Sequence, residues 1–175
     1  YGMEVYDIEN NNLHGGCSRY FIAKKNKKKI TSRVLKHRKL EKKIGTNKIS
    51  TFYKFKKEIN ILKKRLLSTL IELKKKNKTI VGYGAPAKST TILNFCDINF
   101  KLIDKIFDNS KTKIGKYTPG KSLIKIENAE KFKKTYSDYC VLFAWNHKKE
   151  ILSKERFYSR QNGKWIIPVP KLKII

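Results

Sequence analysis

The sequence predicts an α/β fold, in which a mostly parallel, Rossmann-like sheet has flanking helices and follows an antiparallel hairpin. Short apolar runs alternate with helical patterns through residues 51–175, as expected of a parallel sheet. One of these runs ends in a glycine-rich turn that opens a helix, which is typical of dinucleotide-binding folds. Residues 1–24 instead alternate polar and apolar side chains around a glycine-containing loop, which indicates two paired strands.

The first 50 residues predict a hairpin followed by a basic connection. Residues 3–9 and 17–24 have the alternation of strands. Because the chain begins with Tyr1 inside this pattern and not with Met, we expect it to be the C-terminal piece of a longer protein. Residues 25–50 are mostly Lys, Arg and polar side chains, so we expect a linker or an exposed helix there.

Residues 51–76 predict a long amphipathic helix. Apolar side chains recur at steps of three and four residues, and Lys fills the other faces. These apolar positions are Phe52, Phe55, Ile59, Leu62, Leu66, Leu70 and Leu73. Ser50 or Thr51 can cap the start of the helix. The stripe covers only about three heptads, which is short for a coiled coil, so we expect the helix to pack on a sheet.

The remaining pattern predicts a Rossmann-like domain over residues 51–175. Strands are expected at residues 79–83, 102–107, 122–126, 139–144, 164–167 and 172–175. Helices are expected at residues 88–96, 128–136 and 147–159, and a loop at residues 111–120.

The net charge of +28 favours a negatively charged partner. A balance of 42 basic to 14 acidic residues is typical of nucleic-acid-binding proteins. The basic residues are 36 Lys and only 6 Arg, however, whereas specific recognition of phosphate and bases favours the Arg fork. We therefore interpret the charge as a solvated, Lys-rich surface that suits nucleotide diphosphates, and nucleic acid binding is the less favoured alternative.

The cysteines and the hydropathy pattern predict a cytoplasmic protein without a metal site or a membrane span. Cys17, Cys96 and Cys140 lie far apart, with no spacing typical of zinc or of a disulfide framework. Cys96 and Cys140 stand in apolar stretches, which predicts buried, reduced thiols. No apolar run approaches the roughly 18 residues that a membrane-spanning helix needs.

The segment Gly-Tyr-Gly-Ala-Pro-Ala-Lys-Ser-Thr at residues 82–90 carries the strongest functional signal. It follows an apolar strand, opens a helix and fits the Gly-x-Gly-x-x-Ala form of the dinucleotide-binding turn. Gly82 would permit the tight turn, and Gly84 would let a phosphate approach the backbone near Ala85. Side-chain donors follow at Lys88, Ser89 and Thr90.

An acidic residue stands in register with this turn. Asp108 ends the next predicted strand, 20 residues after Lys88, where a carboxylate can hold the hydroxyls of a ribose. The same turn nearly fits the P-loop of ATPases, but Ala87 replaces the second Gly of that loop and Pro86 lacks an N–H donor. A purely structural turn, which only packs the helix on the strand, would give no reason for Lys88 or Asp108.

Several ordered segments resemble a known enzyme family. Residues 82–97 strongly resemble the C-terminal domain of the sugar C-methyltransferases, which methylate carbon 3 of 4-keto-deoxy sugar nucleotides. The resemblance continues at residues 107–109, 113–120 and 144–151 and reaches back to residues 13–19. In that first segment, Cys17 stands where the family usually has Ser.

The resemblance implies that this chain ends a three-part enzyme. A zinc-binding segment would come first, then a class I methyltransferase domain for S-adenosylmethionine, and then this domain, which would hold a sugar linked to a nucleotide diphosphate, with dTDP the expected nucleotide. The hairpin of residues 1–24 would close the methyltransferase sheet. The family's catalytic Tyr, Glu and His precede this chain, so we expect no catalytic residue, metal or cofactor here and no activity from the fragment alone.

Further candidate ligand contacts lie outside the turn, at His14, Arg19, Lys113, Gly115, Trp145 and Asn146. The resemblance favours the histidine as a sugar-pocket residue, and the arginine could meet a diphosphate, although a structural role suits each of them as well. The loop of residues 113–120 could close over the sugar or could be a tight crossover. The Trp-Asn pair ends a core strand at the carboxyl edge of the sheet, where it could stack on and hydrogen-bond to the ligand, and the alternative is a core Trp.

One further function class competes with these. A nicotinamide-binding oxidoreductase module would share the glycine turn, but the sequence shows no catalytic constellation of that class. A nucleic-acid-binding protein, in turn, would explain the charge and leave the glycine turn and the Trp-Asn pair without a reason.

Overall fold

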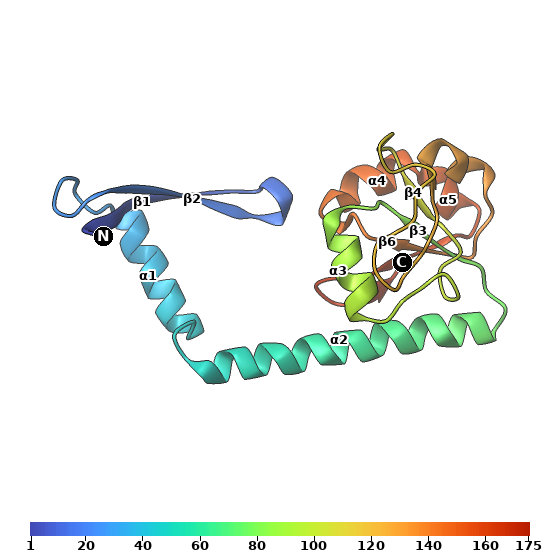
Figure 1. Cartoon of the computed structure of the whole chain (residues 1–175), viewed down its shortest axis with the longest axis horizontal. Coiled ribbons are helices and arrows are strands. Elements are labelled where there is room, and N and C mark those ends of the chain that lie inside the picture. Colours follow the sequence, from blue (N-terminus) through green and yellow to red (C-terminus); the bar gives the residue numbers. More distant parts are fainter. The chain divides into compact units, whose positions relative to one another are not determined.

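A computed structural model describes the whole chain except the side chain of His14, and it divides the chain into two compact units (Figure 1). The units are Tyr1–Glu58 and Ile59–Ile175. The boundary falls within the long helix α2 (Ile49–Lys75), whereas we expected the second domain to start at residue 51. Within the part of the chain that the structure describes, no helix is both long and apolar enough to cross a membrane.

The first unit holds the predicted hairpin and a helix. Its elements before α2 are β1 (Met3–Asn11), the 3-10 turn η1 (Leu13–Gly15), β2 (Cys17–Lys24) and α1 (Ser32–Ile44). β1 and β2 pair antiparallel, and α1 lies in the stretch predicted as a linker or an exposed helix. The carboxylate of Asp7 in β1 accepts hydrogen bonds from Arg33 Nε (2.9 Å) and from the Thr31 hydroxyl (2.7 Å). These bonds hold the pKa of Asp7 well below its usual value, and the bond from Arg33 makes the largest contribution. They also connect the hairpin to α1.

The second unit is built on one sheet. Beyond α2 its elements are β3 (Ile80–Tyr83), α3 (Ala87–Phe95), β4 (Ile106–Asp108), β5 (Ile126–Asn128), η2 (Ala129–Lys134), β6 (Tyr139–Leu142), η3 (Trp145–His147), α4 (Lys148–Lys154), α5 (Arg156–Arg160), β7 (Lys164–Ile167) and β8 (Lys173–Ile174). The strand order is β5-β4-β3-β6-β7-β8, parallel throughout except that β8 pairs antiparallel with β7. The predicted Rossmann-like, mostly parallel sheet is confirmed.

The strand order reverses between β3 and β6. From β3 the chain proceeds outward to β4 and β5, then returns to β6 on the other side of β3 and continues to β7 and β8. Where connections leave neighbouring strands in opposite directions, a crevice opens at the carboxyl edge, and ligands of open α/β sheets bind there. The ends of β3 and β6 are therefore the place where a site is expected.

Apolar layers cover both faces of the sheet. On one face, Leu66 and Leu70 of α2 and Leu93 of α3 are buried against the strands, and burying each such side chain stabilises the fold by about 1.5–3 kcal/mol. The predicted packing of the amphipathic helix on a sheet is confirmed for its second half, whereas Phe52 and Phe55 of the predicted stripe are exposed. The other face carries η2, α4 and α5 around an aromatic cluster, which we define as Tyr83, Phe107, Phe132, Tyr158 and Trp165.

Several predicted elements are shorter, shifted or interrupted, and the helix predicted at residues 128–136 is the shorter 3-10 helix η2. The strand predicted at residues 102–107 starts late because a backbone turn around Asn99 precedes it. The next predicted strand moves toward the C-terminus because Leu123 has a φ of +46°, outside the extended region. The helix predicted at residues 147–159 is interrupted at Glu155, whose side chain is buried.

Candidate functional site

A tight turn joins the end of β3 to the start of α3. Gly84 has a φ of +83°, and a Cβ on it would lie 2.7 Å from the Cβ of Ala144, which follows β6. A Cβ on Gly82 would lie 2.8 Å from the side chains of Ile106 and Phe143. Gly82, which we expected to permit the tight turn, lies within β3, so its role is close packing, whereas Gly84 serves both the turn and the packing.

The peptide groups of Ala85 are held by the protein's own side chains. The Ala85 N–H donates to Oδ2 of Asp108 (2.5 Å), whose Oδ1 accepts the N–H of Ser110 (2.7 Å). Lys113 Nζ donates to the Ala85 carbonyl (2.7 Å). Asp108, which we expected beside a ribose, thus binds the turn through one carboxylate oxygen and the loop after β4 through the other, and an N–H that we expected to meet a phosphate is already bonded.

The first turn of α3 offers fewer side-chain donors than the sequence suggested. Ser89 is buried, and its N–H and its hydroxyl both donate to the carbonyl of Pro86 (2.9 and 2.6 Å). Thr90 is half-buried and lines a pocket at the same end of the helix. The backbone N–H groups there still give the helix N-terminus a partial positive charge.

A cation, an indole ring and an amide oxygen lie where β3 and β6 end. Lys88 Nζ lies 5.6 Å from the ring centroid of Trp145, within the range of a cation–π contact. Asn146 follows in η3, and its Oδ1 is buried and accepts no hydrogen bond from the residues that the structure describes. Leaving a buried oxygen without a donor costs about 1–3 kcal/mol. A ligand that donated a hydrogen bond to this oxygen would remove that cost.

A pocket of about 350 Å³ lies between the start of α3 and the loop of residues 113–119. Lys113 and Lys116 are its charged lining residues. The loop is anchored to its surroundings, because Gly115 (φ +83°) donates its N–H to the Ile126 carbonyl at 2.9 Å. The pocket therefore combines a helix N-terminus with two ammonium groups, an arrangement that favours anions.

Among the lining residues that the sequence did not single out are Lys116, Tyr117 and Thr118, which lie in the loop that we expected could close over the sugar. The hydroxyl of Thr118 is buried and accepts the N–H of Ile124 (2.9 Å), so Thr118 shapes the loop. All three stand in the segment 113–120 that resembles the sugar C-methyltransferases. A loop has no periodicity, however, so its sequence does not reveal which side chains turn toward α3.

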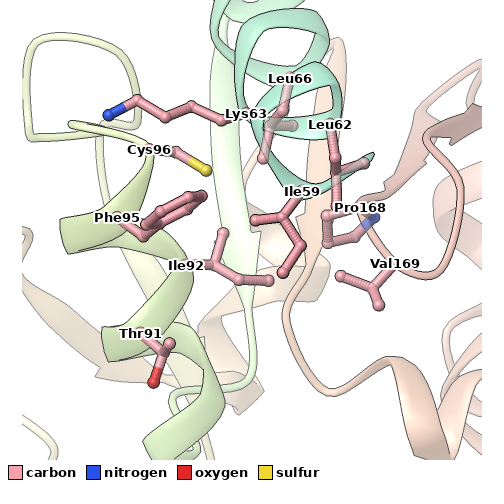
Figure 2. A pocket seen from close by; sticks show the side chains of 10 residues that line it. All are labelled: Ile59, Leu62, Lys63, Leu66, Thr91, Ile92, Phe95, Cys96, Pro168 and Val169. Carbon is pink, nitrogen blue, oxygen red and sulfur yellow. The ribbon is translucent and has the colours of Figure 1, made fainter. Parts of the chain in front are cut away.

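A second pocket, of about 260 Å³, is unsuited to an anion (Figure 2). It lies between α2, α3 and the segment Pro168–Val169, and its lining side chains are mostly aliphatic or aromatic. The one cation, Lys63, turns its Nζ away from the pocket and donates to Asp97 (2.6 Å). Burial raises the pKa of the Cys96 thiol to about 11, so this thiol is neutral.

Two predicted contacts belong to the first unit, Tyr1–Glu58, and not to the unit that holds these pockets. Arg19 is exposed on β2 and lies 3.6 Å from the carboxylate of Glu9. The side chain of His14 lies outside the described part of the structure.

Two comparisons with known proteins give the family context. The model of a family described as C-methyltransferase C-terminal domain matches residues 12–170. The C-methyltransferase NovU of Streptomyces niveus is 27% identical over 176 residues. That match covers 100% of this chain and 42% of the relative, so the chain spans less than half of the relative's length.

Proposed function

Because the chain belongs to the family of C-methyltransferase C-terminal domains, we propose that it is the substrate-holding part of an S-adenosylmethionine-dependent C-methyltransferase. The substrate is a 4-keto-deoxy sugar activated by a nucleotide diphosphate, with dTDP as the nucleotide. The name of the relative supports methyl transfer to carbon.

The proposal is supported by Lys88, Trp145 and Asn146, which lie where β3 and β6 end, at the point where the strand order reverses. Trp145 offers an apolar surface to the base or the sugar, and the Oδ1 of Asn146 accepts a hydrogen bond from the ligand. Lys88 meets the diphosphate, together with Lys113 and the neighbouring charge of Lys116. A diphosphate is the ligand that most needs several cations near a helix N-terminus.

The engaged carboxylate of Asp108 argues against the competing oxidoreductase. A nicotinamide or adenosyl cofactor in a fold of this kind is held through its ribose hydroxyls by an acidic residue in this position. Here each carboxylate oxygen already accepts a backbone N–H. A deoxynucleotide has no 2′-hydroxyl, so it makes a smaller demand on Asp108. We therefore assign Asp108 to the support of the turn, with Gly84, and not to the ribose.

In the reaction that this proposal implies, this chain orients the sugar and supplies no acid or base. A base removes the proton on the carbon next to the 4-keto group, and the resulting enolate carbon forms a bond to the methyl group as the methyl–sulfur bond breaks. S-adenosylmethionine supplies that methyl group. The residues of this chain bind the nucleotide end and thereby align the sugar for the in-line transfer.

The remaining functions of the enzyme we place in parts of the protein outside these 175 residues. We propose that the hairpin of the first unit completes a methyltransferase domain, that this domain holds S-adenosylmethionine, and that a zinc-binding segment precedes it. The 175 residues alone are then inactive in methyl transfer. We also place the protein in the cytoplasm, since the buried, free thiols of Cys96 and Cys140 suit a reducing compartment.

Calorimetric titration of the chain with dTDP, NAD and single-stranded DNA at moderate salt tests the proposal. We expect saturable binding of dTDP, and we expect Lys88→Ala to weaken it by about tenfold or more, because one charge-assisted contact is lost. Lys133→Ala is the matched control, since Lys133 is an exposed lysine of η2 that lines neither pocket.

Each other outcome of this titration has a definite meaning. Equal losses in Lys88→Ala and Lys133→Ala would mean that net charge attracts dTDP and that no site exists at the crevice. A preference for NAD over dTDP would favour the oxidoreductase. Binding of DNA alone, with an affinity that falls steeply as salt increases, would favour a nucleic-acid-binding protein.

A further inference from the structure

We propose that Glu155, which lies outside the candidate site, is a positioning residue that acts through Tyr83 to fix the Gly84 turn and the η3 turn where β3 and β6 end. The ligand-binding part of this proposal rests on the function proposed above. Its structural part stands without a ligand.

Glu155 is an ionisable residue placed inside an apolar layer. It is 1% exposed, and it stands at the interruption between α4 and α5. Its Oε1 accepts the hydroxyl of Tyr83 at 2.8 Å, and the half-exposed Lys154 has its Nζ 3.9 Å from the same oxygen. Its Oε2 is buried and accepts no hydrogen bond from the described residues. Burial first, and the bond to Glu155 second, raise the pKa of Tyr83, so the phenol remains protonated and donates.

Stability alone does not account for this carboxylate. A buried carboxylate with an unsatisfied oxygen is usually less favourable than an apolar side chain of similar volume in the same place. The rest of this face of the sheet is the aromatic cluster defined above, in which an apolar residue would pack without that cost. Residues that break the packing rule of their surroundings are concentrated at positions that serve function.

The position of Tyr83 shows what the bond can serve. Tyr83 is the last residue of β3 and directly precedes the Gly84 turn, and its carbonyl accepts the N–H of Phe143 at 2.9 Å. Glu155 follows α4, and α4 begins directly after the η3 turn that carries Trp145 and Asn146. The bond from the Tyr83 hydroxyl to the Glu155 carboxylate therefore joins the end of β3, which leads into the Gly84 turn, to the end of α4, which follows the η3 turn. We expect the loss of this bond to let the Gly84 turn and the η3 turn shift slightly relative to each other.

The test uses two variants that remove the bond and one matched control. Glu155→Gln keeps the size of the side chain, and Tyr83→Phe removes only the donor. Tyr158→Phe is the control, because Tyr158 is also a buried tyrosine of the aromatic cluster, and its hydroxyl contacts Ser137 (3.5 Å) and the Lys164 carbonyl (3.4 Å) instead of Glu155. All three variants lose buried polar contacts of the same layer, so a general loss of stability would affect all three.

The first measurement needs no ligand. We expect Tyr83→Phe and Glu155→Gln to move the NMR amide signals of Gly84 and Ala85 and the indole signal of Trp145, while Tyr158→Phe leaves them in place. Unchanged signals in the first two variants, or the same changes in all three, would overturn the positioning role. This result is independent of whether the chain binds dTDP.

The second measurement is the affinity for dTDP. Tyr83→Phe and Glu155→Gln are each expected to raise the Kd by roughly threefold to tenfold, as for the loss of one hydrogen bond. The double variant should be no weaker than the single ones, since both changes break the same bond. Unchanged affinity in the single variants of a chain that binds dTDP would overturn the proposal. Failure of the unaltered chain to bind dTDP would instead overturn the proposed function and leave the NMR result to decide the positioning role.

Discussion

Gly84 and Gly115 share a φ of +83° but differ in their surroundings. A Cβ on Gly84 would lie 2.7 Å from the Cβ of Ala144 and 3.2 Å from its N, whereas a Cβ on Gly115 would have no atom within 4 Å. The first glycine is thus fixed by backbone conformation and by contact, and the second by backbone conformation alone. Comparing the two glycines therefore separates the cost of a left-handed backbone from the cost of a steric clash.

Gly84→Ala should therefore destabilise the protein more than Gly115→Ala does. A left-handed residue with a side chain costs about 1–2 kcal/mol, and overpacking adds about 1–3 kcal/mol. We expect about 1 kcal/mol for Gly115→Ala and about 3 kcal/mol for Gly84→Ala in urea unfolding. Equal losses would mean that Ala144 yields easily and that β3 and β6 are not tightly joined at their ends.

Sequence reasoning at this scale found the residues of the turn but not their partners. The spacing of Gly82, Gly84 and Lys88 after an apolar run is a local pattern, and it placed the turn correctly. The bond from Ala85 to Asp108 spans 23 positions and depends on the register of two strands, which a single sequence does not contain. Glu155 gave no signal at all, because a Glu in a helical pattern is normally exposed.

Among the elements, β3 and β6 are joined at their starts as well as at their ends. Asp138 precedes β6 and accepts hydrogen bonds from the Thr79 N–H and hydroxyl (both 2.8 Å) and from Lys78 Nζ (3.0 Å). Burial by itself would raise the pKa of Asp138, but these bonds outweigh it and lower the pKa to about 2. The charged form of Asp138 therefore stabilises the pairing of the two strands.

This shift predicts a defined pH dependence. The pKa of Asp138 is lower in the folded state than its ordinary value of 3.8, so its contribution is complete above pH 4 and is lost as the pH falls from about 4 to about 2. Asp138→Asn should lower the free energy of unfolding at pH 7 and flatten its decline over that window. Thr79→Val removes one of the donors to Asp138, so the decline in its free energy of unfolding should lie between that of the unaltered chain and that of Asp138→Asn. A variant that declined as steeply as the unaltered chain would show that other carboxylates control acid unfolding.

The elements themselves were predictable where their pattern was long or strongly apolar. α2 and the hairpin strands have clear periods, and their bounds agree with the prediction to within two residues. β4 and β5 have three residues each, which is too short for a period to define their ends. The interruption between α4 and α5 depends on the buried side chain of Glu155, which is a tertiary effect.

At the scale of the whole molecule, the dominant feature is charge. The formal net charge is +28 over 175 residues, and most of the ion pairs involve partly exposed side chains, such as Lys63 with Asp97 and Lys74 with Asp104. Exposed pairs of this kind contribute about 0–1 kcal/mol each. Repulsion between the unpaired lysines should therefore exceed the attraction within the pairs.

Screening of that repulsion should stabilise the fold. We expect the Tm to rise by about 2–5 °C when NaCl is increased from low to moderate concentration, because the Debye length falls to about 10 Å at 0.1 M. The measurement is a thermal melt in a buffer without polyvalent anions, repeated with KCl as the control for ion-specific effects. A falling Tm would mean that attraction within the ion pairs exceeds repulsion between the lysines.

The Asp108 carboxylate, which accepts the N–H groups of Ala85 and Ser110, affects how a ligand would bind. Both amides are already hydrogen-bonded to Asp108, so this backbone keeps its shape without help from an incoming molecule. Association then carries no entropy penalty for ordering this stretch of backbone, and encounter can be limited by diffusion and by electrostatic steering. In this preorganised loop the Asp108 carboxylate already holds the two amides, so an external anion would meet the positive helix N-terminus without first ordering this stretch of backbone.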